Sequence, residues 1–222
     1  MWIMSRRGPT TAEAVPGPPR PPLADRLAHP RGVLVVSAAA FAAVTLLVVL
    51  GAAAEIDAAV RDVLLAWAGP GVVAAMRVVN HAGDWKVLAP GMVVLLAVFP
   101  RARRRWWIWV ALMLAAPLAE GGLKELIGRP RPEGGAFGFP SGHATAAAAY
   151  FGALAYLAGA LRSPGACLVV RLGGLAVVPL VGAARVVLRA HWPSDVLGGI
   201  ALGLALAAAA ALADATQDPG AR

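Results

Sequence analysis

The sequence has few charged residues and a single cysteine. Charged side chains make up 14% of the 222 residues and apolar ones 59%, which is too apolar for an ordinary soluble domain. The lone cysteine, Cys167, excludes an intrachain disulfide and any site that binds a metal through several cysteines. The composition therefore points to a membrane protein.

Long charge-free runs predict an all-α fold, a polytopic membrane bundle. Residues 32–54, 144–161 and 196–213 contain no charged side chain, and a bilayer crossing needs about 20 mainly apolar residues. Three shorter charge-free cores reach that length only if flanking charges lie at the interface or face the protein interior: 87–100, 106–119 and 172–184. We therefore expect six transmembrane helices within residues 31–213.

The net charge of +8 is distributed as in a membrane protein. Arginines gather before residue 32, in the run 101–105 and at Arg162 and Arg171, which are alternate connections of a six-span chain. The positive-inside rule assigns such connections to the cytoplasm. We therefore expect a multi-pass protein of the cell membrane with both termini cytoplasmic, and nucleic-acid binding is not needed to explain the charge.

The segments outside the six spans carry their own expectations. Residues 1–30 contain seven prolines and are predicted to form a flexible cytoplasmic tail, and residues 214–222 a short C-terminal tail. Residues 55–86 alternate charged and apolar positions and are broken at Gly69-Pro70-Gly71. That pattern fits amphipathic helices on the outer face or capping the bundle, or a re-entrant element.

A first chemical motif follows the third span. Lys124 comes four residues after Glu120, so both side chains share a helix face. The segment Gly128-Arg129-Pro130-Arg131-Pro132 comes directly after it, and its prolines enforce an extended backbone. An ammonium group and a guanidinium fork together suit a phosphate. A helix-end ion pair between Glu120 and Lys124 is the alternative interpretation.

A second motif opens the fourth span. In Phe139-Pro140-Ser141-Gly142-His143 the proline and glycine favour a tight turn, and Ser141 is a natural N-cap for the following helix. Backbone N–H groups at a helix N-terminus bind anions. A phosphate bound there would lie beside His143, which could protonate a leaving oxygen. A simple helix cap with an interfacial histidine is the alternative.

A third motif joins the fifth and sixth spans. His191 and Asp195 are four residues apart, so the carboxylate can hold one imidazole nitrogen and leave the other as a nucleophile. Arg185 lies at the edge of the fifth span and Asp195 at the mouth of the sixth, where unpaired charges are unfavourable. Arg185 therefore needs an anion, which is either a substrate or, in the alternative interpretation, Asp195 itself.

The three motifs together resemble the signature of the type 2 phosphatidic acid phosphatase superfamily. The matching pattern is Lys124–six residues–Arg131-Pro132, then Pro140-Ser141-Gly142-His143, then Arg185–five residues–His191–three residues–Asp195. One position departs from the family. A serine usually precedes the arginine of the third motif, and this chain has Ala184, which removes one hydrogen bond to phosphate, about 1–2 kcal/mol.

The resemblance implies a role for each motif residue. His191 would attack phosphorus and form a phosphohistidine, Asp195 would orient it, and His143 would protonate the leaving group and then activate water. The phosphate oxygens would be held by Lys124, Arg131, Ser141, the Gly142 backbone N–H and Arg185. The resemblance implies no metal and no other cofactor.

The resemblance also implies the substrate class, a lipid phosphate or diphosphate in the outer leaflet. Phosphatidic acid, phosphatidylglycerol phosphate, polyprenyl diphosphates and related prenyl-phosphate sugars are the candidates. Eighteen arginines against two lysines suggest a GC-rich bacterial source, which favours a polyprenyl diphosphate slightly. Transfer of the phosphoryl group to an alcohol, and a lipid-phosphate binder or transporter without hydrolysis, are the alternatives. The sequence predicts no oligomeric state.

Overall fold

Proline and glycine set the ends of the main helices. Pro30, Pro164 and Pro193 each begin a helix, where a missing backbone N–H leaves no bond unmade. Gly128 ends another with φ 64°, a left-handed conformation that glycine adopts without a Cβ penalty.

The computed structural model describes residues 29–217. Its helices are α2 (Pro30–Val49), α3 (Ala54–Ala66), α4 (Pro70–Asn80), η1 (His81–Gly83), α5 (Trp85–Val98), α6 (Pro100–Arg104), α7 (Trp106–Ile127), α8 (Gly142–Leu157), η2 (Ala158–Ala160), α9 (Pro164–Val187) and α10 (Pro193–Thr216).

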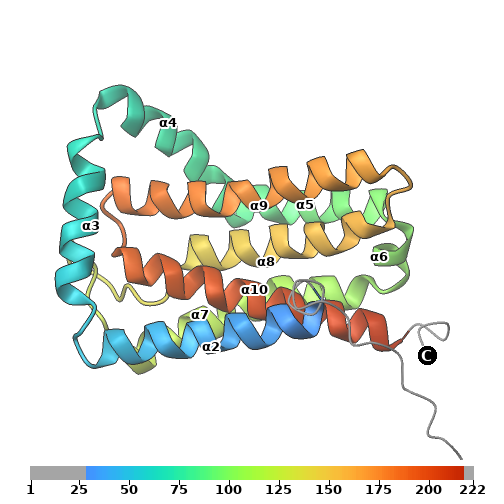
Figure 1. Ribbon diagram of the computed structural model, residues 1–222, viewed down its shortest axis with the longest axis horizontal. Helices are drawn as coiled ribbons and strands as arrows, with labels where there is room; N and C mark the ends of the chain where they lie inside the picture. The colour runs from blue at the N-terminus through green and yellow to red at the C-terminus, as the bar shows by residue number, and fades with distance from the viewer. Residues whose placement is uncertain (1–28, 218–222) are drawn as a thin grey trace, which may run out of the picture.

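The all-helical class predicted from the sequence is confirmed. Helices α2, α5, α7, α8, α9 and α10 run along the long axis of the molecule (Figure 1). A buried cluster around Trp109, Leu112 and Leu157 joins α5, α7, α8 and α10. The predicted N-terminal tail up to residue 28, and residues 218–222, lie outside the described residues.

Glycines on α10 let it approach α8 closely. A Cβ built on Gly199 would lie 2.5 Å from the Ser141 carbonyl oxygen, and one on Gly203 would overlap the Thr145 carbonyl oxygen. Side chains at these positions would force the two helices apart. Because the helices touch, the first turn of α8 lies beside the first turn of α10.

The predicted count of six spans is not confirmed. In the described part of the chain, four helices are long and apolar enough to cross a membrane: α2, α7, α9 and α10. Helix α8 has 16 residues and α5 has 14, which gives about 24 Å and 21 Å at 1.5 Å per residue. Both are shorter than a hydrocarbon core of about 30 Å. The six-span reading stays a prediction.

The predicted amphipathic region, residues 55–86, contains two helices separated by a sharp bend. Helices α3 and α4 meet at 115°, and α3 lies across one end of the bundle (Figure 1). By length and composition the bent pair also qualifies as one broken span or re-entrant loop. The side of α3 that faces the bundle carries Asp57, which is 2% exposed.

The arginine-rich connections between helices and the predicted motifs lie at opposite ends of the bundle. The arginine-rich α6 and the turn between α8 and α9 are at the end opposite α3, together with the end of α10 (Figure 1). Helix α10 continues beyond residue 213, where a tail was expected, to Thr216. Asp214 on this added turn is buried and ion-paired with Arg101 and Arg105.

Candidate active site

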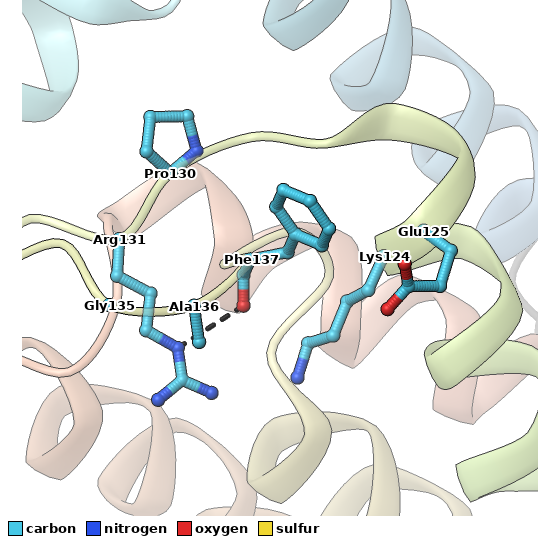
Figure 2. A pocket seen from close by; sticks show the side chains of 7 residues that line it. All are labelled: Lys124, Glu125, Pro130, Arg131, Gly135, Ala136 and Phe137. Atoms are coloured by element: carbon cyan, nitrogen blue, oxygen red, sulfur yellow. Dashed lines mark hydrogen bonds between the residues drawn. The ribbon is translucent and has the colours of Figure 1, made fainter.

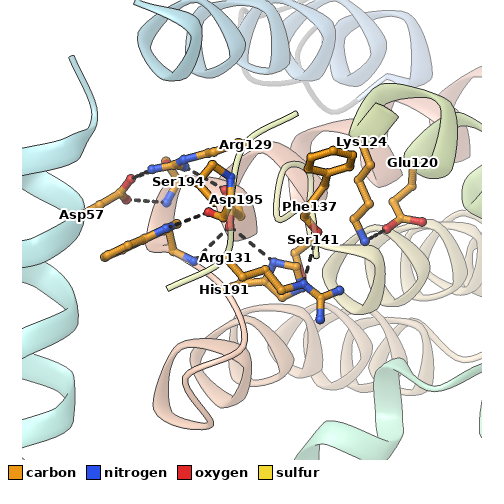
Figure 3. Close-up of polar contacts among 12 residues, drawn as sticks. Asp57, Glu120, Lys124, Arg129, Arg131, Phe137, Ser141, His191, Ser194 and Asp195 are labelled. Atoms are coloured by element: carbon orange, nitrogen blue, oxygen red, sulfur yellow. Dashed lines mark hydrogen bonds and ion pairs between the residues drawn. The ribbon is translucent and has the colours of Figure 1, made fainter. Parts of the chain in front are cut away.

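The three motifs meet at the end of the bundle that α3 crosses. The Ser141 backbone N–H, just before α8, donates to the Asp195 carbonyl oxygen in the first turn of α10 at 2.9 Å. The loop that follows α7 is folded back on itself, because the Gly138 N–H donates to the Arg129 carbonyl oxygen at 2.7 Å. Motif residues that are up to 71 positions apart in the sequence are therefore gathered in one region at this end of the bundle (Figure 3).

His191 and Asp195 form the pair that their spacing predicted. His191 Nδ1 lies 3.4 Å from Asp195 Oδ2, and the same oxygen accepts the Trp192 backbone N–H at 3.0 Å. Burial lowers the pKa of His191, which is only 1% exposed, against the opposing effect of its bond to Asp195. The ring is therefore neutral at pH 7. With Nδ1 facing the carboxylate as a donor, the lone pair of Nε2 is available as a nucleophile.

Two arginines of the motifs lie near His191. Arg131 reaches the site from the loop after α7 and donates through Nε to the Phe137 carbonyl oxygen at 3.2 Å. Arg185, in the last turn of α9, donates through Nη1 to Asn80 Oδ1 at 2.8 Å. The two guanidinium groups are close enough to repel one another. An anion between them would relieve that repulsion.

Arg185 and Asp195 do not pair with each other. The ion partner of Asp195 is Arg129, with Nη1 to Oδ1 at 2.7 Å, and the partner of Arg185 is the neutral side chain of Asn80. The alternative interpretation of the third motif, an Arg185–Asp195 ion pair, is therefore wrong. Among the residues described, Arg185 Nε is buried without a hydrogen-bond partner.

Ser141 occupies the N-cap position of α8, as predicted, but its hydroxyl does not cap the helix. Ser141 is fully buried, and within residues 29–217 its Oγ has no hydrogen-bond partner. A buried polar atom without a partner is unfavourable by about 1–3 kcal/mol. In addition to Arg185 Nε, Ser141 Oγ is therefore a second buried group at the site without a hydrogen-bond partner among the described residues.

Lys124 and Glu120 form an ion pair on α7, which is the contact that the alternative interpretation of the first motif predicted (Figure 3). Glu120 also lies against the beginning of α8, since a Cβ on Gly142 would come within 2.8 Å of Glu120 Oε1. A carboxylate is thus held at a helix N-terminus and beside a lysine, which is an environment that suits any anion.

His143, in the first turn of α8, is half-buried and faces the same region. It lies within the electrostatic range of Arg185, His191 and Lys124. The short helix η1 packs on it closely, because a Cβ on Gly83 would lie 2.8 Å from the His143 carbonyl oxygen. The two histidines of the motifs are therefore brought together with the cations.

Sequence reasoning missed three residues that hold the site in place: Asp57, Asn80 and Ser194. Asp57 accepts the Ser194 backbone N–H at 2.7 Å and the Ser194 hydroxyl at 2.6 Å. The sequence also did not reveal the role of Arg129, which was predicted only as part of the stiff segment after the third span. No local pattern links Asp57 to Arg129, which is 72 positions away.

A cavity of about 610 Å³ opens beside two of the motif cations, Lys124 and Arg131 (Figure 2). Its lining residues come from the end of α7 and the loop after it: Lys124, Glu125, Pro130, Arg131, Gly135, Ala136 and Phe137. Phosphate-binding candidates and apolar surface therefore share one opening. In the described part of the chain no group of three or more His, Cys, Asp or Glu side chains is arranged to hold a metal ion, and metal independence stays a prediction.

Residues 133–218 match the model of the PAP2 superfamily. The decaprenylphosphoryl-5-phosphoribose phosphatase of Mycobacterium tuberculosis is 34% identical over 153 residues, which cover 63% of this chain and 78% of that protein. The phosphatidylglycerophosphatase B of Bacillus subtilis is 34% identical over 142 residues, which cover 59% of this chain and 70% of that protein.

A solved structure also resembles this fold. It is the crystal structure of a transmembrane PAP2-type phosphatidylglycerolphosphate phosphatase from Bacillus subtilis, with a TM-score of 0.73 and 27% sequence identity. The match covers 86% of this chain and 98% of that one.

Proposed function

This chain belongs to the PAP2 superfamily and is a membrane-embedded phosphatase, and on that premise we propose that it hydrolyses a lipid phosphate through a phosphohistidine on His191, without a metal ion. The observation that carries the proposal is the arrangement around His191. Two repelling guanidinium groups, Arg131 and Arg185, and two buried groups without partners, Ser141 Oγ and Arg185 Nε, gather beside a neutral imidazole. A phosphate would satisfy all of them at once.

The first half-reaction forms the covalent intermediate. His191 Nε2 attacks phosphorus in line with the scissile P–O bond, so that a P–N bond forms as that P–O bond breaks. His143 gives its proton to the departing oxygen, which leaves as an alcohol or a phosphate. Asp195 accepts the Nδ1 proton in a hydrogen bond and stabilises the positive charge on the phosphorylated ring.

The second half-reaction restores the enzyme. His143, now neutral, takes a proton from water as the water oxygen attacks phosphorus. The P–N bond breaks, its electron pair returns to Nε2, and inorganic phosphate leaves. Lys124, Arg131 and Arg185 stabilise the charge on the equatorial oxygens in both transition states, which is the role that a metal ion has in many other phosphoryl-transfer enzymes.

The position of the site supports access from the outer leaflet. The motifs lie at one end of the bundle and the arginine-rich α6 at the other (Figure 1), and basic connections face the cytoplasm. We therefore assign the site to the extracytoplasmic face of the cell membrane and both termini to the cytoplasm. A lipid headgroup would enter the cavity beside Arg131 while its tail stays in hydrocarbon.

The names of the two relatives narrow the substrate class. One relative acts on a phosphate carried by ribose and the other on a phosphate carried by glycerol, in both cases on a headgroup linked to a lipid. These names favour a phosphate monoester on a lipid-linked polyol over the polyprenyl diphosphate that composition slightly favoured. Phosphatidic acid is the simplest monoester of this class.

The test is phosphate release by the detergent-purified full chain in excess EDTA. The panel contains phosphatidylglycerol phosphate, phosphatidic acid and a polyprenyl diphosphate, with His191→Ala as the control. Release that continues in EDTA and disappears in His191→Ala is the expected result, and the fastest lipid identifies the class. An added acceptor alcohol reveals any transfer product. Release that requires a metal ion, or that continues in His191→Ala, would contradict the proposal.

A further inference from the structure

Arg129, which the three-part motif does not include, lies at the centre of a network of buried polar groups (Figure 3). Its Nη1 donates to Asp195 Oδ1 at 2.7 Å and to Ser194 Oγ at 2.6 Å, and its Nη2 donates to Asp57 Oδ2 at 2.5 Å. We propose that Arg129, anchored by Asp57 of α3, is a positioning residue that fixes Asp195 and, through it, the ring of His191. The inference rests on the proposed role of His191 as the nucleophile.

The two oxygens of Asp195 have separate tasks. Oδ2 faces His191 Nδ1 and also accepts the Trp192 N–H, whereas Oδ1 is held by Arg129. With both oxygens bound, the carboxylate has no freedom to rotate about its Cβ–Cγ bond. The orientation of the imidazole, and hence the direction in which Nε2 points, follows from that of the carboxylate.

Asp57 makes the network rigid from a different helix. Its Oδ1 accepts the Ser194 backbone N–H, which belongs to the first turn of α10, and its Oδ2 accepts the Ser194 hydroxyl. A carboxylate that usually comes from the N-cap residue itself is here supplied across the fold. Helix α3 is thereby attached to the turn that carries Asp195.

Charge balance requires a cation at the position of Arg129. Asp57 is 2% exposed and Asp195 0%. Asp195 belongs to the first turn of α10, and Asp57 accepts two hydrogen bonds from Ser194 in that same turn. Two buried carboxylates that meet at one helix turn repel each other strongly unless a cation lies between them. Arg129 is that cation, since it forms an ion pair with each carboxylate.

Arginine suits this position better than lysine. Three acceptors are bound through two nitrogens of one planar group, a geometry that an ammonium point charge does not reproduce. The backbone of Arg129 is itself fixed, because its carbonyl oxygen accepts the Gly138 N–H. Its guanidinium also lies 5.8 Å from the centre of the Trp192 ring.

Arg129 and Arg131 are two positions apart and differ in what they contact. Arg129 binds the carboxylate behind His191, whereas Arg131 lines the cavity and is a proposed phosphate ligand. Loss of a positioning residue lowers kcat with little change in KM, and loss of a phosphate ligand also raises KM. The kinetic parameters of the two alanine variants therefore separate the two roles.

The experiment compares Arg129→Ala, Arg129→Lys and Asp57→Asn with Arg131→Ala, using whichever lipid of the panel the unaltered chain hydrolyses. We expect Arg129→Ala to lower kcat about 100-fold, with KM within about threefold. Arg129→Lys and Asp57→Asn should lose about tenfold, since each keeps part of the network. Arg61→Ala is the matched control. Arg61 also lies over the Trp192 ring, at 5.5 Å, but pairs with Glu133.

A pH profile distinguishes positioning from a purely structural role. Removing the positive charge of Arg129 strengthens the attraction between Asp195 and a protonated His191. The acidic limb of kcat then moves to higher pH, because the inactive imidazolium forms more readily. A merely structural residue would lower the amount of folded protein and leave the limb where it is.

The outcomes are distinguishable. A fall in kcat with a displaced acidic limb, and near-normal rates in Arg61→Ala, supports the inference. A normal kcat and limb in Arg129→Lys and Asp57→Asn, both folded, overturns it even if Arg129→Ala does not fold. No phosphate release by the unaltered chain from any lipid overturns the proposed function instead.

Discussion

Helix α10 carries a buried aspartate at each end, and the two differ in what surrounds them. Asp195 in its first turn and Asp214 in its last are both 0% exposed, and both pair with arginine. Around Asp214 the Oδ2 atom is bound by Arg101 and Tyr156 and the Oδ1 atom by Arg105. That network is closed, since the groups that meet there satisfy the carboxylate completely.

The network around Asp195 is open on one side. Asp195 itself is fully bound, but two buried atoms of neighbouring motif residues, Ser141 Oγ and Arg185 Nε, have no partner among the described residues. A buried ion pair alone is therefore not a sign of function in this fold. What marks the active end is that Ser141 Oγ and Arg185 Nε lie without partners near a neutral histidine, where a phosphate would bind to both.

Substitution of the aspartate at one end of α10 should lower activity, and the same substitution at the other end should lower stability. In Asp195→Asn, His191 loses its carboxylate partner, and we expect kcat to fall by about 10⁴-fold, as for other catalytic histidines deprived of their aspartate. Phosphate release per mole of folded protein measures this loss. A kcat within tenfold of the unaltered chain would mean that Asp195 does not orient the nucleophile.

Asp214→Asn makes the same chemical change at the closed end. It leaves Arg101 and Arg105 with a weaker acceptor, so we expect the free energy of unfolding to fall by about 2–3 kcal/mol. The value is below that of a fully buried pair, because the Arg101 side chain is 39% exposed. Thermal unfolding in detergent measures it. A kcat that drops more than about threefold would show that the two ends are coupled.

The same comparison explains how far the sequence predicted the site. Each motif begins or ends a charge-free run, and alternation of spans brings all three to one end, so the meeting of His143, His191 and Arg185 was predictable. The closed network was not. Asp214 was assigned to a tail because nothing in the sequence reveals that Arg101, 113 positions away, would hold it in a longer helix.

The missed part of the active end has a similar cause. The pattern around Asp57 resembles that of any surface amphipathic helix, and its contacts with Arg129 and Ser194 arise only from the way α3 lies across the bundle. That α8 itself ends at Leu157, short of a full span, was also not visible in the sequence, for a different reason. Hydropathy does not distinguish a lipid-facing helix from one that is surrounded by other helices, and α8 is largely buried.

Ala184→Ser adds a donor to the open end. The residue precedes Arg185 in the last turn of α9 and is 0% exposed. We expect kcat/KM to rise about five- to tenfold, equivalent to about 1–1.4 kcal/mol, through one more hydrogen bond to phosphate. Ala183→Ser is the control, since it adds the same hydroxyl on another face of α9. An equal effect in both variants, or a lower thermal midpoint with unchanged kcat/KM, would contradict this expectation.

The smallest expected effect is the pH dependence of the nucleophile. Burial lowers the pKa of His191 below the ordinary value of 6.5, so the neutral, active ring persists at a pH where an exposed histidine is half protonated. At pH 6.5 we therefore expect kcat to stay above about half of its plateau value, and to fall only at lower pH.

The stability of the folded chain should also fall as the pH is lowered, because below pH 6.5 the unfolded chain binds a proton that folded His191 does not. Measurements of kcat and of the thermal midpoint from pH 5 to 8 check both. An acidic limb centred above pH 6.5 would mean that Asp195 outweighs burial, and the open end would then hold an imidazolium rather than a nucleophile at mildly acidic pH.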